Sequence, residues 1–324
     1  MGKIEKTNYD LTNLKSFEEE WLLHKDCSDW WYSTGVLYDS QNNMYSFQFT
    51  FLRMRISQLV QPFILMLAIT DFQTCKHYYN QKTAIFNSCI EINKNKIAWG
   101  NNGVTKDDTE MLITGFGSNF SFDLKAKYGK GAFWHCEKGK LQMAIPNEEE
   151  TTYYYSYTNM PTSGTIQLDG KEIEVTGKTW FDKQGGTFNF LDIKTHWEWF
   201  SMRFNDDEEI MLFSFPQSNY IDGTYINRNG DVERVNNYQI KPLNFVDANG
   251  YKFSSGWELT IPGIKEVNYT ILPVMQGQLN LAYYEQLCKI LNKEKEEVGF
   301  CFVELLPGVY NTKIDSKLLT KKVV

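Results

Sequence analysis

Aromatic residues occupy every second position from Tyr45 to Phe51, and this alternation constrains the fold more than any other feature. The segment reads Tyr-Ser-Phe-Gln-Phe-Thr-Phe, with a small or polar residue in each gap. Successive side chains of a β-strand point to opposite faces, so the pattern predicts a strand with one aromatic face. Aromatic residues make up 15% of the chain, and large rings favour strands throughout.

Dipeptides that accept positive φ angles recur between strand-like runs and predict tight hairpins. They are Asp169-Gly170, Asn229-Gly230 and Asn249-Gly250, of the kind that two-residue hairpin turns require. Strands joined in this way form antiparallel meanders, so the sequence predicts an all-β fold. Further strands are expected at Trp31–Tyr38, Pro62–Ile69, Ala84–Ile92, Lys96–Trp99, Met111–Phe116, Phe120–Ala126, Leu141–Ile145, Thr165–Leu168, Glu172–Val175, Trp197–Phe204, Ile210–Phe215, Phe253–Ile261 and Val298–Leu305.

Helical periodicity occurs in two places, so few short helices are expected. One is Phe17–Leu23. The other is Tyr283–Val298, where Tyr284, Leu287, Ile290 and Leu291 would share a face.

Charge and residue usage exclude several classes of partner. The net charge of −7 argues against a surface that follows nucleic-acid phosphates. The apolar run Pro62–Ile69 is far shorter than a transmembrane helix of about 20 residues. The first residues lack a hydrophobic signal segment, so we expect a cytoplasmic protein, and the oligomeric state stays open.

Metal and disulfide chemistry are not expected. The four histidines do not form a ligand pattern with other His or Cys residues, so no metal and no cofactor is predicted. The six cysteines are scattered without a Cys-x-x-Cys pair, and we expect reduced, mostly buried thiols.

The length of 324 residues predicts two domains, at about 150 residues each. Closing each antiparallel sheet into a barrel would remove exposed strand edges and leave an interior for a small ligand. The glycines and polar residues of Trp180–Gly186 predict an interruption between strands. The predicted boundary therefore lies near Thr195, with one domain at 1–195 and the other at 196–324.

Two segments combine rings with a carboxylate and are candidates for a site. The first is Asp29-Trp30-Trp31-Tyr32, for which a strand start or barrel plug is the alternative interpretation. The second, Val175–Gly186, carries Trp180, Asp182 and Gln184. The motifs of serine hydrolases, nucleotide-binding proteins and His-Glu-x-x-His metalloproteases are absent.

These segments resemble one known family, whose members are the carotenoid 1,2-hydratases (hydroxyneurosporene synthases), fungal kievitone hydratase and the lipocalin-type Diels–Alderases. The resemblance covers most of the chain. It is carried by the paired tryptophans, the aromatic strand ending in Phe51-Leu52-Arg53, Gly164-Thr165-Ile166, the Gly-x-x-Trp-x-Asp motif at 177–182, Trp197-Glu198-Trp199-Phe200-Ser201 and Val303-Glu304-Leu305.

The resemblance implies two tandem lipocalin-like β-barrel domains that hold a hydrophobic polyunsaturated or isoprenoid small molecule. It also implies reactions at double bonds, which include the addition of water and cyclisation. Loss of a proton from a different carbon after protonation would give isomerisation, and we expect no cofactor. One departure matters: where many relatives carry Asp-His, then Glu or Gln, then Trp-Gly, this chain has Asp182-Lys183-Gln184-Gly185-Gly186. The histidine and the tryptophan of that pattern are missing, while Asp182 and Gln184 are retained.

Asp182 is the first choice for an acid that protonates carbon, because burial in an apolar cavity raises the pKa of a carboxyl group. The alternative is a turn carboxylate that caps backbone N–H groups. His135 is a candidate base or hydrogen-bond donor, or else a core histidine. With Asp182, Gln184 and His135 as catalytic candidates, the substrate-binding candidates are Trp31, Tyr32, Phe49, Arg53, Tyr155, Trp180, Trp197, Trp199 and Glu304.

Other interpretations stay open for several of these residues. Arg53 and Glu304 would equally serve in buried structural ion pairs, and Tyr153–Tyr155 would complete the core. A carrier or sensor of a hydrophobic metabolite needs the same cavity without an acid. A structural protein with a filled interior is the third possibility.

Overall fold

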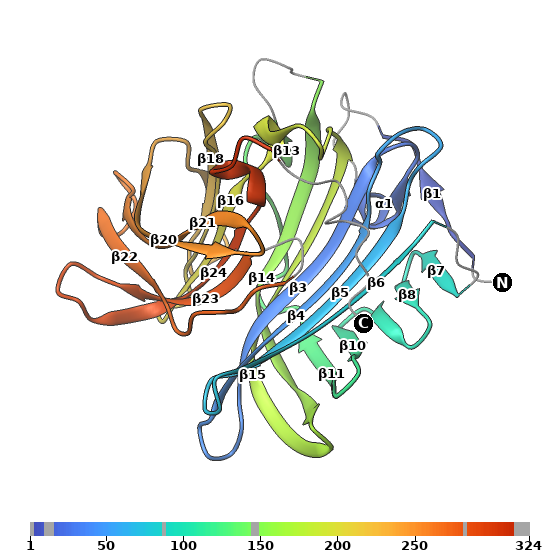
Figure 1. The fold of residues 1–324 in the computed structure, drawn as a ribbon, viewed down its shortest axis with the longest axis horizontal. Coiled ribbons are helices and arrows are strands. Elements are labelled where there is room, and N and C mark those ends of the chain that lie inside the picture. Colours follow the sequence, from blue (N-terminus) through green and yellow to red (C-terminus); the bar gives the residue numbers. More distant parts are fainter. Residues whose placement is uncertain (1–2, 10–15, 86–88, 144–148, 281–283, 314–324) are drawn as a thin grey trace. The chain divides into compact units, whose positions relative to one another are not determined.

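The computed structural model describes residues 3–9, 16–85, 89–143, 149–280 and 284–313. Contacts group the chain into two compact units. Met1–Trp134 and Thr152–Thr187 belong to the first, and His135–Thr151 and Phe188–Lys321 belong to the second. Almost every element in both units is a strand, so the predicted all-β fold of two tandem barrel domains is confirmed (Figure 1).

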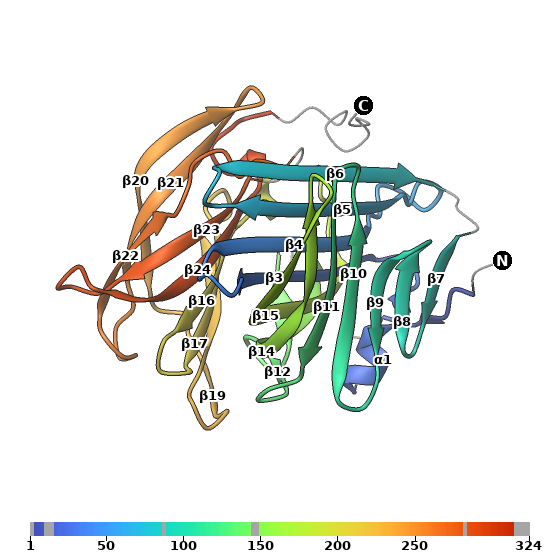
Figure 2. The same ribbon diagram turned by 90° about the horizontal axis from the view of Figure 1, so that it is seen from below.

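The first unit contains a curled antiparallel sheet with the strand order β6-β5-β4-β3-β15-β14-β11-β10-β9-β8-β7. Figure 2 shows it curving from β6 round to β7. Short strand β12 pairs with β14, and β1 pairs with β2 in parallel. The elements are β1 (Lys6–Thr7), α1 (Phe17–Trp21), β2 (Leu23–His24), β3 (Ser28–Tyr38), β4 (Met44–Arg53), β5 (Phe63–Asp71), β6 (Lys76–Ala84), β7 (Ile90–Asn93), β8 (Lys96–Trp99), β9 (Asn102–Lys106), β10 (Glu110–Phe116), β11 (Phe120–Lys127), β12 (Ala132–Trp134), β14 (Thr151–Leu168) and β15 (Lys171–Thr187).

The second unit contains a sheet with the order β19-β18-β17-β16-β24-β23-β22-β21-β20. Its strands pair antiparallel, in hairpin succession from β16 to β19 and from β20 to β24, and β16 also pairs with β24. The elements are β13 (Lys140–Gln142), η1 (Ile193–Thr195), β16 (Glu198–Phe204), β17 (Glu209–Phe215), β18 (Tyr220–Ile226), β19 (Val232–Arg234), β20 (Gln239–Ala248), β21 (Tyr251–Thr260), β22 (Asn268–Pro273), β23 (Tyr284–Leu291), β24 (Glu297–Leu305) and η2 (Pro307–Val309).

Helix α1 forms where a capping box starts it. The Ser16 side chain accepts from the Glu19 backbone N–H, and the Glu19 carboxylate accepts from the Ser16 N–H. This exchange satisfies two N–H groups that a helix start leaves unpaired. The helix brings Trp21 into the core, where its ring lies 5.7 Å from that of Phe181 and its indole N–H donates to the carbonyl oxygen of Asn93.

Each unit has its own apolar core. The alternating aromatic residues of β4 point into the first core, where Phe47, Phe49 and Phe51 are fully buried. Their rings contact others, as Phe51 does with Phe63 at 5.7 Å between ring centroids. The second core gathers around Trp257, whose ring meets that of Phe200 edge to face at 5.4 Å.

The helix predicted at Tyr283–Val298 is wrong. Residues Tyr284–Leu291 form strand β23, and β24 begins at Glu297. Five consecutive residues from Tyr284 to Cys288 are buried, because this strand is central in its sheet and is covered on both faces. Such a strand loses its alternation, and a short apolar run then also fits a helical period.

Three further expectations need correction or fall partly outside the described residues. Trp180–Gly186 does not interrupt a strand, because β15 runs unbroken from Lys171 to Thr187. The strand predicted at Ala84–Ile92 is divided between β6 and β7, and residues 86–88 lie outside the described ranges. Strand β13 ends at Gln142, and residues 144–145 of the strand predicted at Leu141–Ile145 likewise lie outside the described ranges.

Two smaller findings bear on the cysteines and on membranes. Cys27, Cys136, Cys288 and Cys301 are buried, whereas Cys75 and Cys89 are exposed. Among the described residues, the structure contains no helix long and apolar enough to cross a bilayer.

Candidate active site

The candidate site lies on one face of β15, whose neighbours in the sheet are β3 and β14. In the register of β15 with β3, Asp182 is opposite Tyr32 and Lys183 is opposite Trp31. Because side chains alternate along a strand, Asp182 lies on the same face as Tyr32, and Lys183 lies on the opposite face with Trp31. The strand therefore divides the motif into two chemically different environments.

Three donors converge on one oxygen of the Asp182 carboxyl group. Oδ1 accepts from the hydroxyl of Tyr154 at 2.8 Å and from the indole N–H of Trp180 at 2.6 Å. The hydroxyl of Ser156 also donates to this oxygen. Asp182 is 5% exposed, so this carboxyl group is held away from solvent by a tyrosine, a serine and a tryptophan.

Burial raises the pKa of Asp182 to about 7, and the hydrogen bonds from Ser156, Trp180 and Tyr154 oppose the rise only in part. A carboxyl group with this pKa holds a proton in a substantial part of the molecules at neutral pH. Such a group can donate a proton and later take one back. This is the protonation behaviour that general acid catalysis needs.

Gln184 extends the polar row on the same face of β15. Its side-chain amide donates to the hydroxyl of Thr152 on β14 at 2.9 Å. Gln184, Thr152 and Tyr32 on β3 are all buried.

The alternative interpretation of Asp182 as a turn carboxylate is wrong, because Asp182 lies within a strand that pairs with β3 on both sides of this position.

On the opposite face of β15, Lys183 belongs to a buried ionic network. Its ammonium group lies 2.8 Å from Oδ1 of Asp29 and 3.6 Å from Oε1 of Glu20. The ring of His24 bridges the same two carboxylates, at 2.7 Å from Asp29 and 3.1 Å from Glu20. Arg53 adds a second cation 3.6 Å from Asp29.

The network is closed to solvent and internally compensated. Glu20, His24, Asp29 and Lys183 have no exposed surface. Although burial alone would raise the pKa of Asp29, Lys183 and His24 hold it well below its ordinary value. Burial would lower the pKa of His24, but Asp29 and Glu20 reverse this effect and raise it.

Gly185 is required where this network meets β15. A Cβ atom at this position would overlap Oδ1 of Asp29 and would lie 2.6 Å from Nδ1 of His24 and 2.9 Å from Nζ of Lys183. Gly185 lies in the segment whose composition predicts an interruption of the strand, and its lack of a side chain instead allows the ionic groups to approach β15.

The remaining candidates of the first unit lie in its core. Trp31 and Phe49 are fully buried in the apolar cluster, and the indole N–H of Trp31 donates to the carbonyl oxygen of Trp21. Arg53 donates to the carbonyl oxygens of His24 and Cys27 besides pairing with Asp29. Tyr155 is buried with its ring 5.3 Å from that of Trp134.

The other candidates belong to the second unit. Trp197 donates from its indole N–H to Glu304 at 2.6 Å, and Trp199 is the strand partner of Glu304. His135 is fully buried, and burial lowers its pKa to about 3, so its ring is neutral at pH 7. His135 lies in the second unit, whereas Asp182 and Gln184 lie in the first.

Sequence reasoning missed a second buried carboxyl group, that of Glu198 between Trp197 and Trp199. Its Oε1 accepts from the hydroxyls of Ser254 and Tyr310, and burial raises its pKa against these two donors. A serine and a tyrosine thus hold a buried carboxyl group in each unit. A glutamate between two tryptophans on a predicted buried strand was the available signal.

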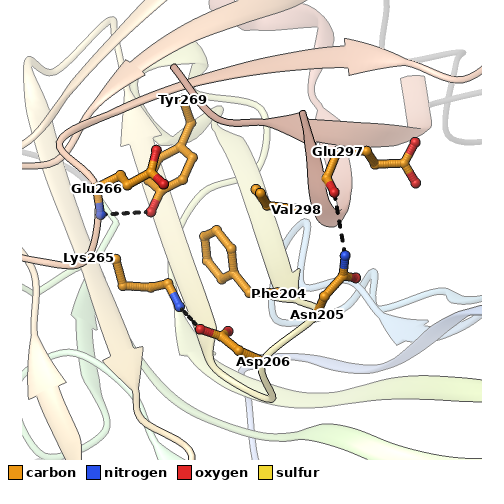
Figure 3. A pocket seen from close by; sticks show the side chains of 8 residues that line it. All are labelled: Phe204, Asn205, Asp206, Lys265, Glu266, Tyr269, Glu297 and Val298. Atoms are coloured by element: carbon orange, nitrogen blue, oxygen red, sulfur yellow. Dashed lines mark hydrogen bonds and ion pairs between the residues drawn. The ribbon is translucent and has the colours of Figure 1, made fainter. Parts of the chain in front are cut away.

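A pocket of about 230 Å³ lies in the second unit, between the loops that follow β16 and β21 and the start of β24 (Figure 3). The Lys265 ammonium group binds Asp206 and Glu208 at 2.5 and 2.7 Å and sits over the ring of Phe204. None of the sequence candidates lines it. Its lining residues are Phe204, Asn205, Asp206, Lys265, Glu266, Tyr269, Glu297 and Val298.

Comparison with known proteins confirms the family resemblance. The sequence model of the AttH-like family matches residues 12–308. A putative AttH from Nitrosomonas europaea is 19% identical, with a TM-score of 0.83 over 94% of this chain and 100% of the other. Kievitone hydratase from Nectria haematococca is 18% identical, with a TM-score of 0.70 over 87% of this chain and 89% of the other.

A third similar structure is that of CghA with Sch210972. It is 8% identical, with a TM-score of 0.51 over 88% of this chain and 89% of the other. No curated protein matches this chain. At these identities the structural comparisons establish the fold.

Proposed function

Because this chain belongs to the AttH-like family, we propose that it is a cofactor-independent enzyme that protonates a double bond of a hydrophobic small molecule. Asp182 is the proposed acid. The observation that carries the proposal is a buried carboxyl group whose pKa lies at about 7 and whose Oδ1 is fixed by three donors. The proposed substrate class is a polyunsaturated or isoprenoid compound.

The proposed reaction begins with proton transfer from the carboxyl group of Asp182 to an alkene carbon, which leaves a carbocation and a carboxylate. Loss of a proton from a neighbouring carbon back to Asp182 gives an isomer. Capture by water gives the hydrated product, with the proton of that water returned to Asp182. Attack by a second double bond of the same molecule closes a ring and moves the positive charge to another carbon, and loss of a proton from a neighbouring carbon to Asp182 then gives the neutral cyclic product.

The donors around Asp182 suit the second half of this cycle. After proton transfer the carboxylate carries a negative charge, and Tyr154, Ser156 and Trp180 donate to the oxygen where that charge collects. Hydrogen bonds to an ionised acceptor are stronger than those to a neutral one. They lower the barrier to proton release without keeping the group permanently ionised.

Ring faces would stabilise the cation, since aromatic rings attract positive charge. Trp180 shares the face of Asp182, and Tyr32 lies opposite Asp182 in the register. We retain Gln184 as a catalytic candidate on this face. Trp197, Trp199 and Glu304 remain proposed substrate-binding residues, and His135 remains a proposed catalytic residue. Trp31, Phe49, Arg53 and Tyr155 also remain proposed for substrate binding, but they lie with Lys183 on the face of the sheet opposite Asp182 and so do not stand beside the proposed acid.

The names of two similar structures agree with this class of chemistry. One is a hydratase, and the other was solved with a bound small molecule, Sch210972. These likenesses support the proposal at the level of the fold.

The test is to incubate the protein with a panel of polyunsaturated fatty acids and isoprenoids and to analyse the products by mass spectrometry. In heavy-oxygen water, hydration adds a labelled oxygen to the product. In heavy water, isomerisation adds deuterium at carbon. Asp182→Asn should lower turnover by at least about 100-fold, the usual range for loss of a general acid, while Asp169→Asn, a change at an exposed turn, should not.

A carrier of a hydrophobic metabolite is the second candidate function, and the position of Lys183 favours it. Lys183 stands where many relatives carry histidine, and its ammonium group is engaged by Asp29 and Glu20 on the far face of the strand. Lys183 therefore adds no base beside Asp182. Binding of a panel compound without turnover, equal in wild type and Asp182→Asn, would establish the carrier and refute the enzyme.

A further inference from the structure

Exposed apolar side chains gather at one end of the first sheet, in the loop of residues 54–62 that joins β4 to β5. Leu59 is 90% exposed, and Ile56 and Val60 are exposed beside it. We call these three residues the apolar tip. Ile85 is exposed at the same end, because it directly follows β6, whose last residue pairs with the first residue of β5. Apolar side chains that gather on one exposed surface mark an interaction site, whereas isolated ones do not.

The loop satisfies part of its own backbone. The N–H groups of Ile56 and Ser57 donate to the carbonyl oxygen of Val60 at 3.0 and 3.1 Å. The N–H of Val60 donates to the hydroxyl of Ser57 at 3.1 Å, and the N–H of Met54 donates to the carbonyl oxygen of Pro62 at the base of the loop. Backbone groups that enter an apolar medium need partners within the protein. These bonds therefore prepare the loop to leave water.

The charge of the loop favours an uncharged apolar medium as its partner. Arg55 is the one charged residue among residues 54–62, and it precedes the apolar tip. Its backbone N–H donates to the hydroxyl of Ser28, which fixes the base of the loop to β3. The net charge of the chain is −7, so an anionic lipid surface would repel the protein. A zwitterionic bilayer surface suits a protruding apolar tip on such a chain.

The loop begins at the end of the sheet face that carries Asp182. Thr50, Tyr32 and Asp182 are register partners and form one row across β4, β3 and β15. Strand β4 ends at Arg53, three residues beyond Thr50, which is about 10 Å along a strand. The apolar tip therefore stands at the end of the face on which the proposed acid lies.

We propose that the loop of residues 54–62 docks this protein on the surface of a zwitterionic lipid bilayer. The apolar tip enters the boundary between the headgroups and the acyl chains, and a hydrophobic substrate passes from the bilayer to the face of Asp182. The passage of substrate rests on the proposed function, whereas the docking rests on the loop alone. Three inserted side chains give shallow and reversible binding.

The first experiment measures binding of the full-length chain to phosphatidylcholine vesicles by flotation. Wild type should float with the vesicles, and Leu59→Ser should lower the partition coefficient at least about tenfold, because burial of one leucine side chain shifts an equilibrium by that factor or more. Phe116→Ser is the matched control. Phe116 is 46% exposed and precedes the turn that contacts Asp169 at the other end of the sheet, so this variant should bind as wild type does.

The second experiment locates the inserted segment. With the exposed Cys75 and Cys89 changed to serine, Leu59→Cys is labelled with a dye whose emission shifts to the blue in apolar surroundings. Phosphatidylcholine vesicles should produce this shift at Leu59→Cys and not at a labelled Phe116→Cys. Binding should also be equal in 0.1 M and 0.5 M salt, because salt screens charge attraction and leaves apolar insertion in place.

Four results would overturn the docking proposal. They are a wild type that does not float, equal flotation of wild type and Leu59→Ser, binding that 0.5 M salt abolishes, and a doubled mass in solution that Leu59→Ser restores to 37.9 kDa. The last result would assign the apolar tip to contact between two copies of the chain. Since Leu59 is almost fully exposed, the variant should keep the circular dichroism spectrum of wild type.

Turnover assays separate this proposal from the proposed function. For a panel compound that the enzyme converts, Leu59→Ser should lower turnover when the compound is dissolved in vesicles and leave it unchanged when the compound is dispersed with cyclodextrin. Asp182→Asn should lower both rates and still float with vesicles. Vesicle binding without turnover of any panel compound would refute the enzyme and leave the docking, whereas turnover without vesicle binding would refute the docking and leave the enzyme.

Discussion

The most consequential single residue is Asp182, because its environment sets its protonation near neutral pH. Burial raises its pKa from 3.8 to about 7. The unfolded chain ionises this group above pH 4, whereas the folded protein keeps it protonated until about pH 7. Ionisation therefore costs folding stability progressively between these values, by roughly 4 kcal/mol at most.

Asp182→Asn should remove this cost, because an amide stays neutral and can still accept the three hydrogen bonds. We expect the free energy of unfolding of the variant to exceed that of wild type at pH 8 and to match it more closely at pH 5. Urea unfolding at both values measures the difference. An equal loss of stability at pH 5 and pH 8 would contradict the assigned pKa.

Asp169 is the contrasting control, because its pKa shift has the opposite sign. Hydrogen bonds from Tyr78, Asn119 and Lys76 lower the pKa of Asp169. Its contribution to stability is therefore present above its unfolded pKa and is lost as the pH falls through the lower folded value. Asp169→Asn should then weaken the protein at pH 8, in the direction opposite to Asp182→Asn.

Lys183, unlike Asp182, compensates buried carboxylates, so its substitution should lower the stability of the protein. Lys183→Met removes a buried cation and leaves Asp29 and Glu20 with less compensation. Breaking a buried ion pair in this way costs about 3–5 kcal/mol. Urea unfolding measures the loss, and Lys178→Met, at an exposed position on the same strand, should change stability by less than about 0.5 kcal/mol.

Individual strands differ in how far their sequences reveal them. The alternation of β4 predicts both the strand and its buried face, since every second residue from Tyr45 to Phe51 enters the core. Strand β23 hides its alternation because it is buried on both faces, and a β-bulge between Ile290 and Leu291 shifts its register further. The periodicity of its apolar residues then resembles a helix.

Only part of the candidate site can be identified from a single segment of the sequence. Asp182 and Trp180 were identified from a short motif in one strand. Their partners Tyr154 and Ser156 come from another strand, and the ionic network joins Lys183 to residues more than 150 positions earlier in the chain. Such contacts depend on strand register, which a single sequence does not reveal.

The hairpin between β14 and β15 offers a test of one turn. Asp169 and Gly170 have φ angles of 49° and 84°, as a two-residue turn with two positive φ values requires. A Cβ atom at Gly170 would meet no neighbouring atom, so Gly170→Ala would cost only backbone strain, about 1–2 kcal/mol. Thermal unfolding should show this loss, with Lys171→Ala as the near-neutral control.

The molecule as a whole divides its stability between two cores. The first apolar cluster contains residues of the first unit only, and the cluster around Trp257 contains residues of the second unit only. The sheet of the first unit is completed by the pairing of β3 with β15, and that of the second unit by the pairing of β16 with β24, so each unit has the elements of a separate cooperative transition. Proteins with more than one domain commonly depart from two-state unfolding for this reason.

Calorimetry of two core variants tests this division. Phe49→Ala in the first core and Phe200→Ala in the second each remove a fully buried ring, at a cost of about 3–5 kcal/mol. We expect the thermogram of the full chain to contain two transitions, with each variant lowering the midpoint of a different one. If both variants instead shift one common transition by the same amount, the two cores unfold as one unit, and the free energy of each substitution is shared across the whole molecule.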